Sequence, residues 1–200
     1  MSGLIDGLDL RAALLGVKED GAAYVPGALG GEFRRRLQRE LEAGPFAPVP
    51  RQVGEVSQEV ASFLARGVAF DAFPLARELL EELTTVVKRD GVGIKGLSGW
   101  KPNVVMVQRF QPGTLGITPH LDGKRFAHLV AIVTTKGTAR FTLCRNRKGD
   151  PVARWRLGPG SVVLLRAPGF AGVEDGRPFH MVAGPPRGER YSLAFRMDTR

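Results

Sequence analysis

Apolar side chains recur with helical spacing in two stretches of the first half of the chain. In GGEFRRRLQRELEAG the apolar stripe consists of Phe33, Leu37 and Leu41. Gly44 and Pro45 then end the pattern. The stretch DAFPLARELLEELTTVVKRDG has Pro74 in its first turn and Gly91 at its end, and its stripe consists of Leu75, Leu79, Leu83 and Val86. We predict helices over both stretches and a shorter helix over residues 57–67.

The periodicity changes after residue 99, where short β-rich runs alternate with glycine, proline and aspartate. The runs occupy residues 103–110, 128–135, 139–144, 152–157, 161–166 and 190–196. Strand–helix–strand alternation is missing, which argues against a nucleotide-binding α/β sheet. The sequence therefore predicts an α+β chain with helices first and then an antiparallel β-sandwich or barrel. We expect one domain over residues 1–200, mainly helical at 1–99 and β-rich at 100–200.

The composition suits a folded protein of a reducing compartment. Of the 200 residues, 43% are hydrophobic and 24% are charged, which is sufficient for a core. Cys144 is the only cysteine, so an intramolecular disulfide and a cysteine zinc cluster are excluded. The first residues lack a basic start followed by an apolar run, and no run reaches membrane-span length. We expect a cytoplasmic protein without a membrane partner.

Positive charge is concentrated in the second half of the chain. Residues 1–100 hold 12 Lys+Arg and 14 Asp+Glu, whereas residues 101–200 hold 17 and 6, for a formal net charge of +9. This asymmetry indicates an anionic partner such as nucleic acid, or else an arginine-rich composition without functional meaning. The sequence makes no prediction about the oligomeric state.

Two short motifs resemble known ones but do not predict a nucleotide-binding or a hydrolase site. GVGIKG, from Gly91 to Gly96, has the glycine spacing of a dinucleotide-binding loop. Because it follows a helix and precedes a strand, we interpret it as a flexible turn. Ser98 in GLSGW lacks the spacing of a hydrolase nucleophile.

The stretch TPHLDGKRF contains a histidine and an aspartate at strand spacing. Side chains alternate along a strand, so His120 and Asp122 would point to the same side. His180, at the start of the closing β segment, is a candidate third ligand. Two histidines and one carboxylate form the facial triad of non-haem Fe(II) sites. His128 lies in an apolar run, and we expect it in the core or behind the ligands.

Two arginines of the last β run share one face. Arg190 and Arg196 lie six residues apart, which is about 20 Å in an extended strand. Two inward-leaning guanidinium groups at this separation leave room for a short dicarboxylate, which each would bind in bidentate fashion. The alternative is a pair of surface arginines.

Together, HLD, the distal His180 and RYS ten residues later resemble the Fe(II)/2-oxoglutarate-dependent oxygenase superfamily. The order VVMVQRFQPG, HLD, GSVVLL, FHMV and RYSLAFR is similar to its AlkB-like branch. The resemblance covers Asn103 to Met197. It implies a double-stranded β-helix (jelly-roll) core with the N-terminal helices packed on it.

The resemblance also implies roles for the site residues. The ligands of Fe(II) would be His120, Asp122 and His180. Arg190 would pair with the far carboxylate of the cosubstrate 2-oxoglutarate, Ser192 would assist, and Arg196 would lie near the metal. The reaction would consume O₂ and release succinate and CO₂ while a C–H bond of the substrate is hydroxylated or oxidatively demethylated.

Two departures from the branch leave the substrate open. Phe110 and Gln108 stand where the branch usually has tyrosine and asparagine, and Phe110 cannot donate a hydrogen bond to the cosubstrate. Gln108 is therefore a further candidate at the cosubstrate site. The GKRF that follows Asp122 lacks the acidic residues of base-repairing relatives. Both departures argue against base repair and leave the oxygenase reaction untouched.

A basic hairpin is predicted at CRNRKGDPVARWR. Its candidate substrate residues are Arg145, Arg147, Lys148 and Trp155. In a jelly-roll oxygenase such a hairpin would border the pocket mouth, where its cations could follow a phosphate backbone. Trp155 or Trp100 could then stack on a base. The alternative is a solvated hairpin with both tryptophans in the core.

Three classes of function remain. The first is an AlkB-like oxygenase of alkylated nucleic acid. The second is a 2-oxoglutarate-dependent hydroxylase of a small metabolite, a biosynthetic intermediate or a protein side chain. The third is a non-catalytic, cupin-like jelly-roll module, which ranks last because a cupin site needs an H-x-H pair and a nearby glutamate.

Overall fold

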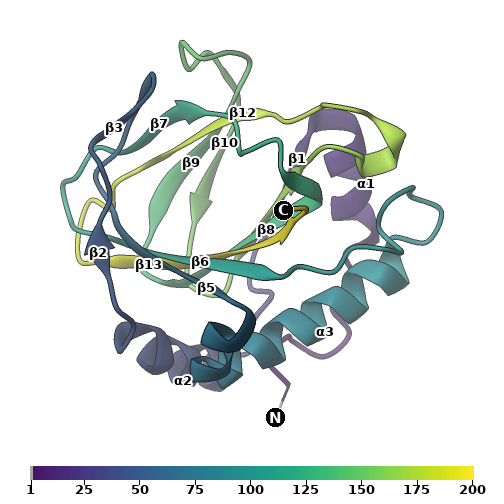
Figure 1. Cartoon of the computed structure of the whole chain (residues 1–200), viewed down its shortest axis with the longest axis horizontal. Coiled ribbons are helices and arrows are strands. Elements are labelled where there is room, and N and C mark those ends of the chain that lie inside the picture. Colours follow the sequence, from purple (N-terminus) through teal and green to yellow (C-terminus); the bar gives the residue numbers. More distant parts are fainter. Residues whose placement is uncertain (1) are drawn as a thin grey trace.

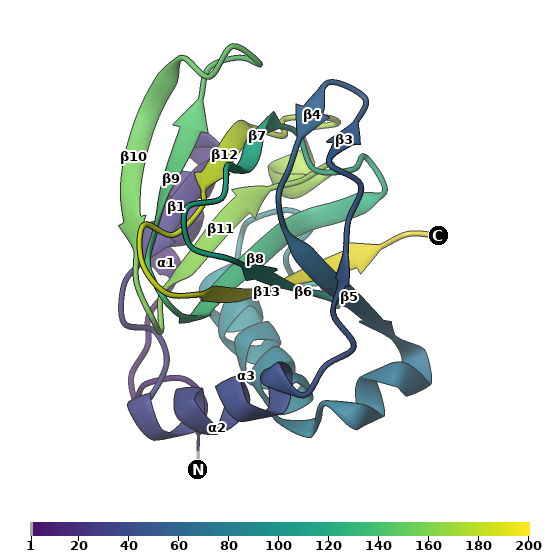
Figure 2. The same cartoon turned by 90° about the vertical axis from the view of Figure 1, so that its left-hand side faces the viewer.

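Two antiparallel sheets face each other in the computed structural model, which describes residues 2–200 (Figures 1 and 2). The seven-stranded main sheet contains, in spatial order, β1 (Ala22–Val25), β11 (Val162–Arg166), β8 (Phe126–Lys136), β13 (Arg190–Asp198), β6 (Val104–Phe110), β5 (Ala61–Arg66) and β2 (Ala47–Pro48). The smaller sheet contains β10 (Pro151–Leu157), β9 (Ala139–Cys144), β12 (Phe179–Ala183) and β7 (Gly116–His120). A short hairpin of β3 (Gln52–Val53) and β4 (Val56–Ser57) lies beside β7.

Helices cover the outer face of the main sheet. The helices are α1 (Arg11–Asp20), α2 (Gly31–Glu42) and α3 (Pro74–Asp90), with 3₁₀ turns η1 (Gly67–Ala72) and η2 (Phe170–Gly172). Figure 2 shows α2 and α3 below the main sheet, and α1 packs against β1 and β11. The predicted stripe of α2 is buried, while α3 buries Leu79, Leu83 and Val87 and leaves Leu75 and Val86 partly buried. None of the helices in residues 2–200 is long and apolar enough to span a membrane.

The alternation along β13 divides the interior into two cores. Leu193 and Phe195 belong to the core between the main sheet and the helices. Arg190, Ser192 and Arg196 point the other way, into the space between the two sheets. The second core, between the sheets, includes Phe110, Phe126, Phe141 and Val182. The predicted α+β jelly-roll with N-terminal helices packed on it is therefore confirmed.

The predicted helix over residues 57–67 is wrong. Residues 61–66 form β5, which pairs with β6 along its whole length. Phe63 and Ala65 are buried whereas Leu64 and Arg66 are exposed, which is the two-residue period of a strand. Val60, Phe63 and Leu64 happen to have helical spacing, so the local pattern suits both structures and pairing with β6 decides.

Other strands were also missed by the sequence pattern. β1 and β5 extend the main sheet from the first half of the chain, and β7 and β12 belong to the smaller sheet. His180 lies on β12, a strand of its own, and not at the start of the closing strand. The GVGIKG stretch forms turns between α3 and β6, as predicted.

Candidate metal centre

Pairing of β7 with β12 brings two histidines together. His120, the last residue of β7, is directly opposite His180 in this pair, and their ring centroids are 4.3 Å apart. Asp122 follows two residues after the end of β7. One ligand atom from each of these three residues lies within 4.8 Å of the other two. The structure thus brings the three predicted metal ligands to one point.

Backbone carbonyls determine which nitrogen of each imidazole is free. Nδ1 of His120 is 2.9 Å from the carbonyl oxygen of Thr118, and Nδ1 of His180 is 3.1 Å from that of Pro178. A carbonyl only accepts, so each Nδ1 carries a hydrogen, and in the neutral ring Nε2 is the nitrogen with a free lone pair. The ring of Phe141 stacks on His180 at 5.5 Å and fixes its plane. Both histidines are therefore oriented as metal ligands before a metal arrives.

The charge states at this point also suit a divalent cation. Burial raises the pKa of the Asp122 carboxyl, but Arg196 and the two imidazoles lower it by more, so its pKa lies below the usual value. Burial, together with His120, lowers the pKa of His180 to about 4 against the opposing effect of Asp122. An ionised carboxylate and neutral imidazoles are the forms that bind metal.

The carboxylate of Asp122 has one oxygen paired with an arginine and one oxygen without a partner in the described chain. Oδ1 accepts from Nη2 of Arg196 at 3.3 Å, while Oδ2 is buried without a hydrogen-bond partner among residues 2–200. A buried carboxylate oxygen without a partner is costly, and a cation would satisfy it. The donor set of two Nε2 atoms and one carboxylate oxygen fits Fe(II) with open positions left for other ligands.

Arg177 is a site residue that the sequence analysis missed. Its guanidinium donates to the backbone carbonyl of Asp122 and is clamped by the carboxylate of Asp175 at 2.7 and 2.8 Å. The side chain of Arg177 is only 10% exposed. It therefore ties the turn that carries Asp122 to the segment that leads into β12. Its position three residues before His180 was the only signal in the sequence.

The other end of the same β13 face is built around Arg190. This side chain is 2% exposed, donates to Oγ1 of Thr134 at 3.1 Å, and lies 5.2 Å from the centre of the Phe110 ring. Burial lowers the pKa of Arg190 to about 10, and no carboxylate pairs with it in the described part of the chain. A buried guanidinium without a counter-ion fits an anionic ligand.

Polar groups between the two arginines also lack partners. Within residues 2–200 the buried atoms without a hydrogen bond include Nε of Arg190, Oγ of Ser192, and Nε and Nη1 of Arg196. Across the sheet, Ser192 is directly opposite Thr134 on β8 and Gln108 on β6. Because native proteins leave few buried polar atoms unsatisfied, this row fits a dicarboxylate that reaches from Arg190 toward the candidate metal ligands.

Several solved structures share this architecture at low sequence identity. Neither a protein-family model nor a curated protein matches the chain. A Burkholderia pseudomallei oxidoreductase of the 2OG-Fe(II) oxygenase family has a TM-score of 0.66 at 12% identity, covering 98% of this chain and 93% of that one. A Pseudomonas putida prolyl-4-hydroxylase has a TM-score of 0.59 at 15% identity, covering 94% and 98%. OsALKBH1 has a TM-score of 0.55 at 15% identity, covering 88% and 98%.

This chain has the 2OG-Fe(II) oxygenase fold. The matches include prolyl hydroxylases as well as OsALKBH1, so the fold does not single out the AlkB-like branch. At these identities the likeness concerns the architecture alone, and the chemistry has to be argued from the residues.

In this oxygenase fold the predicted basic hairpin connects β9 and β10 beside the candidate metal centre. Arg145 and Lys148 are exposed. Arg147 pairs with Glu55 of the β3–β4 hairpin at 3.0 Å and lies 5.4 Å from the ring of Phe179, the neighbour of His180. The two hairpins thus meet beside Phe179, and this edge of the sheets next to His180 is called the mouth below. Glu55 neutralises one of the predicted cations there.

The aromatic candidates lie elsewhere. Trp155 stacks between Tyr24 and Phe141 at 6.1 and 5.7 Å, so its ring packs against the core between the sheets. Trp100 is fully buried and donates to the carbonyl oxygen of Leu129 at 2.8 Å, which rules out base stacking there. His128 lies away from the ligands, with Nδ1 against Gly96 and a left-handed φ of 64°.

Proposed function

We propose that this protein is an Fe(II)- and 2-oxoglutarate-dependent dioxygenase that oxidises a C–H bond of its substrate and releases succinate and CO₂. One observation carries the proposal. The inward face of β13 carries Arg196 beside the three-residue donor set and, six residues away, a buried Arg190 without a counter-ion among residues 2–200. In the donor set, Oδ2 of Asp122 is buried without a partner in the described chain. Stability alone gives no reason to bury both.

One end of this face would bind the metal and the other end would bind the cosubstrate. His120, Asp122 and His180 would hold Fe(II), which when bound supplies the oxidative chemistry with O₂. Arg190, Thr134 and Ser192 bind the distal carboxylate of 2-oxoglutarate and orient the cosubstrate along β13. Arg196 holds the Asp122 carboxylate in its ionised form. The surrounding apolar side chains of the core between the sheets exclude water from the site.

Anaerobic reconstitution with Fe(II) and 2-oxoglutarate tests this proposal. The wild type should show the charge-transfer absorbance of the Fe(II)–2-oxoglutarate complex, and should release succinate when O₂ and a substrate panel are added. His120→Ala and Asp122→Ala should lose both signals because each removes a ligand. His128→Asn is the matched control, since asparagine tolerates the left-handed φ of 64° and lies outside the donor set. Normal 2-oxoglutarate turnover by either ligand variant would disprove the assignment.

For the substrate we propose alkylated nucleic acid. Support comes from the exposed Arg145 and Lys148 at the mouth and from the charge of the second half of the chain. Formaldehyde release from methylated single-stranded oligonucleotides tests it, because oxidative demethylation expels the methyl carbon. An enzyme that turns over 2-oxoglutarate with another substrate and never with these oligonucleotides is not a nucleic-acid demethylase.

The second candidate is a 2-oxoglutarate-dependent hydroxylase of a small anionic metabolite or a protein side chain. The neutralisation of Arg147 by Glu55 and the packing of Trp155 into the core favour it, because both remove predicted contacts to nucleic acid. Succinate release stimulated by a small acid, without any by oligonucleotides, would select this candidate. For either function, a cytoplasmic location of the protein is our proposal from the sequence.

A further inference from the structure

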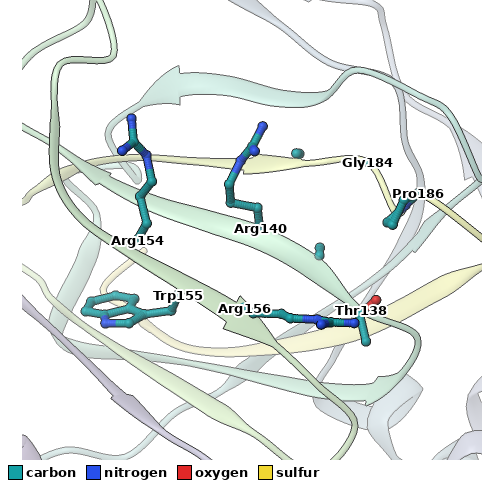
Figure 3. A pocket seen from close by; sticks show the side chains of 9 residues that line it. Thr138, Arg140, Arg154, Trp155, Arg156, Gly184 and Pro186 are labelled. Carbon is teal, nitrogen blue, oxygen red and sulfur yellow. The ribbon is translucent and has the colours of Figure 1, made fainter.

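Three arginines lie on the outer face of the smaller sheet, away from the candidate metal centre. Arg140 on β9 and Arg154 and Arg156 on β10 are all exposed, and none pairs with a carboxylate among residues 2–200. Figure 3 shows Arg140 and Arg154 reaching from neighbouring strands toward the same side of the sheet. Three positive charges are thus grouped without a partner in the described chain.

The strand register makes this grouping costly. Arg156 is directly opposite Arg140 in the β9–β10 pair, and Arg154 is two residues further along the same face. Two residues of a strand span roughly 6.7 Å. Like charges directly opposite each other destabilise a sheet. An external anion bound between the arginines would relieve this repulsion.

The arginines line a groove of about 470 Å³. Its other walls are formed by small side chains and backbone of Thr138, Ala139, Ala183, Gly184 and Pro186, together with Trp155. The Trp155 ring is engaged with Tyr24 and Phe141, so the groove offers no deep apolar pocket for a peptide anchor. The three guanidinium groups are therefore the charged groups that the groove offers to a ligand. Pairing of β9 with β10 fixes the backbone positions of the three arginines relative to one another.

Basic residues continue from this groove to the mouth. β10 leads from Arg156 back to the β9–β10 hairpin, where Arg145 and Lys148 are exposed and Arg147 touches Phe179. Residues 137–157 contain six basic residues and one acidic residue. Helix α2, by comparison, has four basic and three acidic residues in Gly31–Glu42. The charged side chains of β10 are thus all positive, whereas those of α2 are of both signs.

We propose that the Arg140–Arg154–Arg156 groove binds the sugar–phosphate backbone of single-stranded nucleic acid and leads it toward the mouth. A phosphate backbone presents closely spaced single negative charges, which suits three neighbouring guanidinium groups that have no carboxylate partner among residues 2–200. Each guanidinium fork binds a phosphate through two hydrogen bonds. This inference deepens the nucleic-acid version of the proposed function and rests on it for the choice of partner.

Binding of a fluorescently labelled single-stranded DNA oligonucleotide to the metal-free full chain tests the groove directly. The groove variant carries Arg140→Gln, Arg154→Gln and Arg156→Gln. Its matched control carries Arg35→Gln, Arg36→Gln and Arg39→Gln, three exposed arginines of α2 without a carboxylate partner in residues 2–200, so both variants have the same net charge. Anisotropy is measured over a salt series.

We expect the groove variant to bind at least about tenfold more weakly, and its slope of log K against log salt to fall by about 2 for three lost phosphate contacts. The control should stay within about twofold of wild type. Thermal unfolding of both variants checks that they fold. Equal losses in the two variants, or no oligonucleotide binding by wild type at low salt, would overturn the inference.

Two further outcomes separate this inference from the proposed function. If polyglutamate displaces the DNA at equal charge concentration, the groove binds anionic protein and the nucleic-acid assignment is wrong. If wild type binds DNA through the groove yet gives no Fe(II)–2-oxoglutarate absorbance, the oxygenase proposal fails while the groove stands. The groove arginines lie outside the metal and cosubstrate residues, so the groove variant should keep that absorbance.

Discussion

At the residue scale, the surroundings of Arg190 suggest what replaces the tyrosine that the AlkB-like branch usually carries. Phe110 occupies that position and offers its ring face to the guanidinium at 5.2 Å. Thr134 supplies the hydroxyl, 3.1 Å from Nη2 of Arg190, and Ser192 adds a second hydroxyl without a partner in the described chain. The hydroxyl groups on this face therefore come from β8 and β13 and not from β6.

Removing the Thr134 hydroxyl should weaken the cosubstrate site. Thr134→Val keeps the shape and leaves Arg190 short of one hydrogen bond, which is worth about 1 kcal/mol. We expect KM for 2-oxoglutarate to rise about fivefold, with kcat little changed, because only the ground-state contact is lost. Thr135→Val is the control, since that hydroxyl bonds to Gln38 on the other face at 2.6 Å. A higher KM in the control and not in Thr134→Val would contradict this role.

Arg177 acts on the metal ligand through the backbone of Asp122. Arg177→Gln removes the cation between Asp175 and the Asp122 carbonyl, so the turn that carries the ligand loses its tether. We expect the affinity for Co(II), used as a spectroscopic substitute for Fe(II), to fall by about 10-fold. Lys124→Gln is the control, because Lys124 reaches Asp175 at 3.6 Å from a 77% exposed position. Unchanged Co(II) affinity in Arg177→Gln would show that the tether is structural only.

The sequence identified some of these residues and missed others for a physical reason. Arg190 and Arg196 share a face of β13 by parity, so short-range alternation was sufficient for them. His120 and Asp122 were identified from the same two-residue spacing, although Asp122 lies beyond the end of β7. Thr134 meets Arg190 only because β8 and β13 pair, and Arg177 meets Asp122 across 55 residues. Contacts between segments far apart in sequence leave no local pattern to read.

At the element scale, residues 57–67 show the limit of periodicity. Little more than one turn of apparent helical spacing was outweighed by pairing with β6, which the segment itself does not encode. The helices α2 and α3 were predictable because their apolar stripes continue over more than two turns. The short strands β7 and β12 were not, because five residues containing glycine or bordered by it give little alternation.

The strand assignment of β5 predicts opposite effects for neighbouring residues. Phe63 is 8% exposed and packs against Phe46 and Phe73 at 4.9 and 5.0 Å, whereas Leu64 is 44% exposed. Phe63→Ala should lower the free energy of unfolding by about 3 kcal/mol or more. Leu64→Ala, the control, should change it by about 0.5 kcal/mol or less. Chemical denaturation measures both, and similar losses would contradict the burial pattern of a strand.

At the scale of the whole molecule, the two sheets enclose charged side chains among apolar ones. Arg190 is buried there without a carboxylate partner among residues 2–200. β13 is central in the main sheet and carries Arg190 and Arg196 inward, and β7 and β12 of the smaller sheet present His120 and His180. Facing sheets thus bring together residues from both halves of the β-rich region. Without ligand, burial and the neighbouring charges of His120 and Arg196 favour the neutral form of His180, because another buried cation at this point would add repulsion.

The metal-free protein should therefore lose stability in mild acid. The pKa of His180 is lowered to about 4 from 6.5, so below pH 6.5 the unfolded chain binds a proton that the folded chain does not. The free energy of unfolding should fall as the pH drops from 6.5 to 4, by about 3 kcal/mol at most. His180→Asn keeps a donor for the Pro178 carbonyl and does not titrate, so most of this slope should vanish. Urea unfolding at a series of pH values measures it, and the same slope in wild type and His180→Asn would refute the assignment to His180.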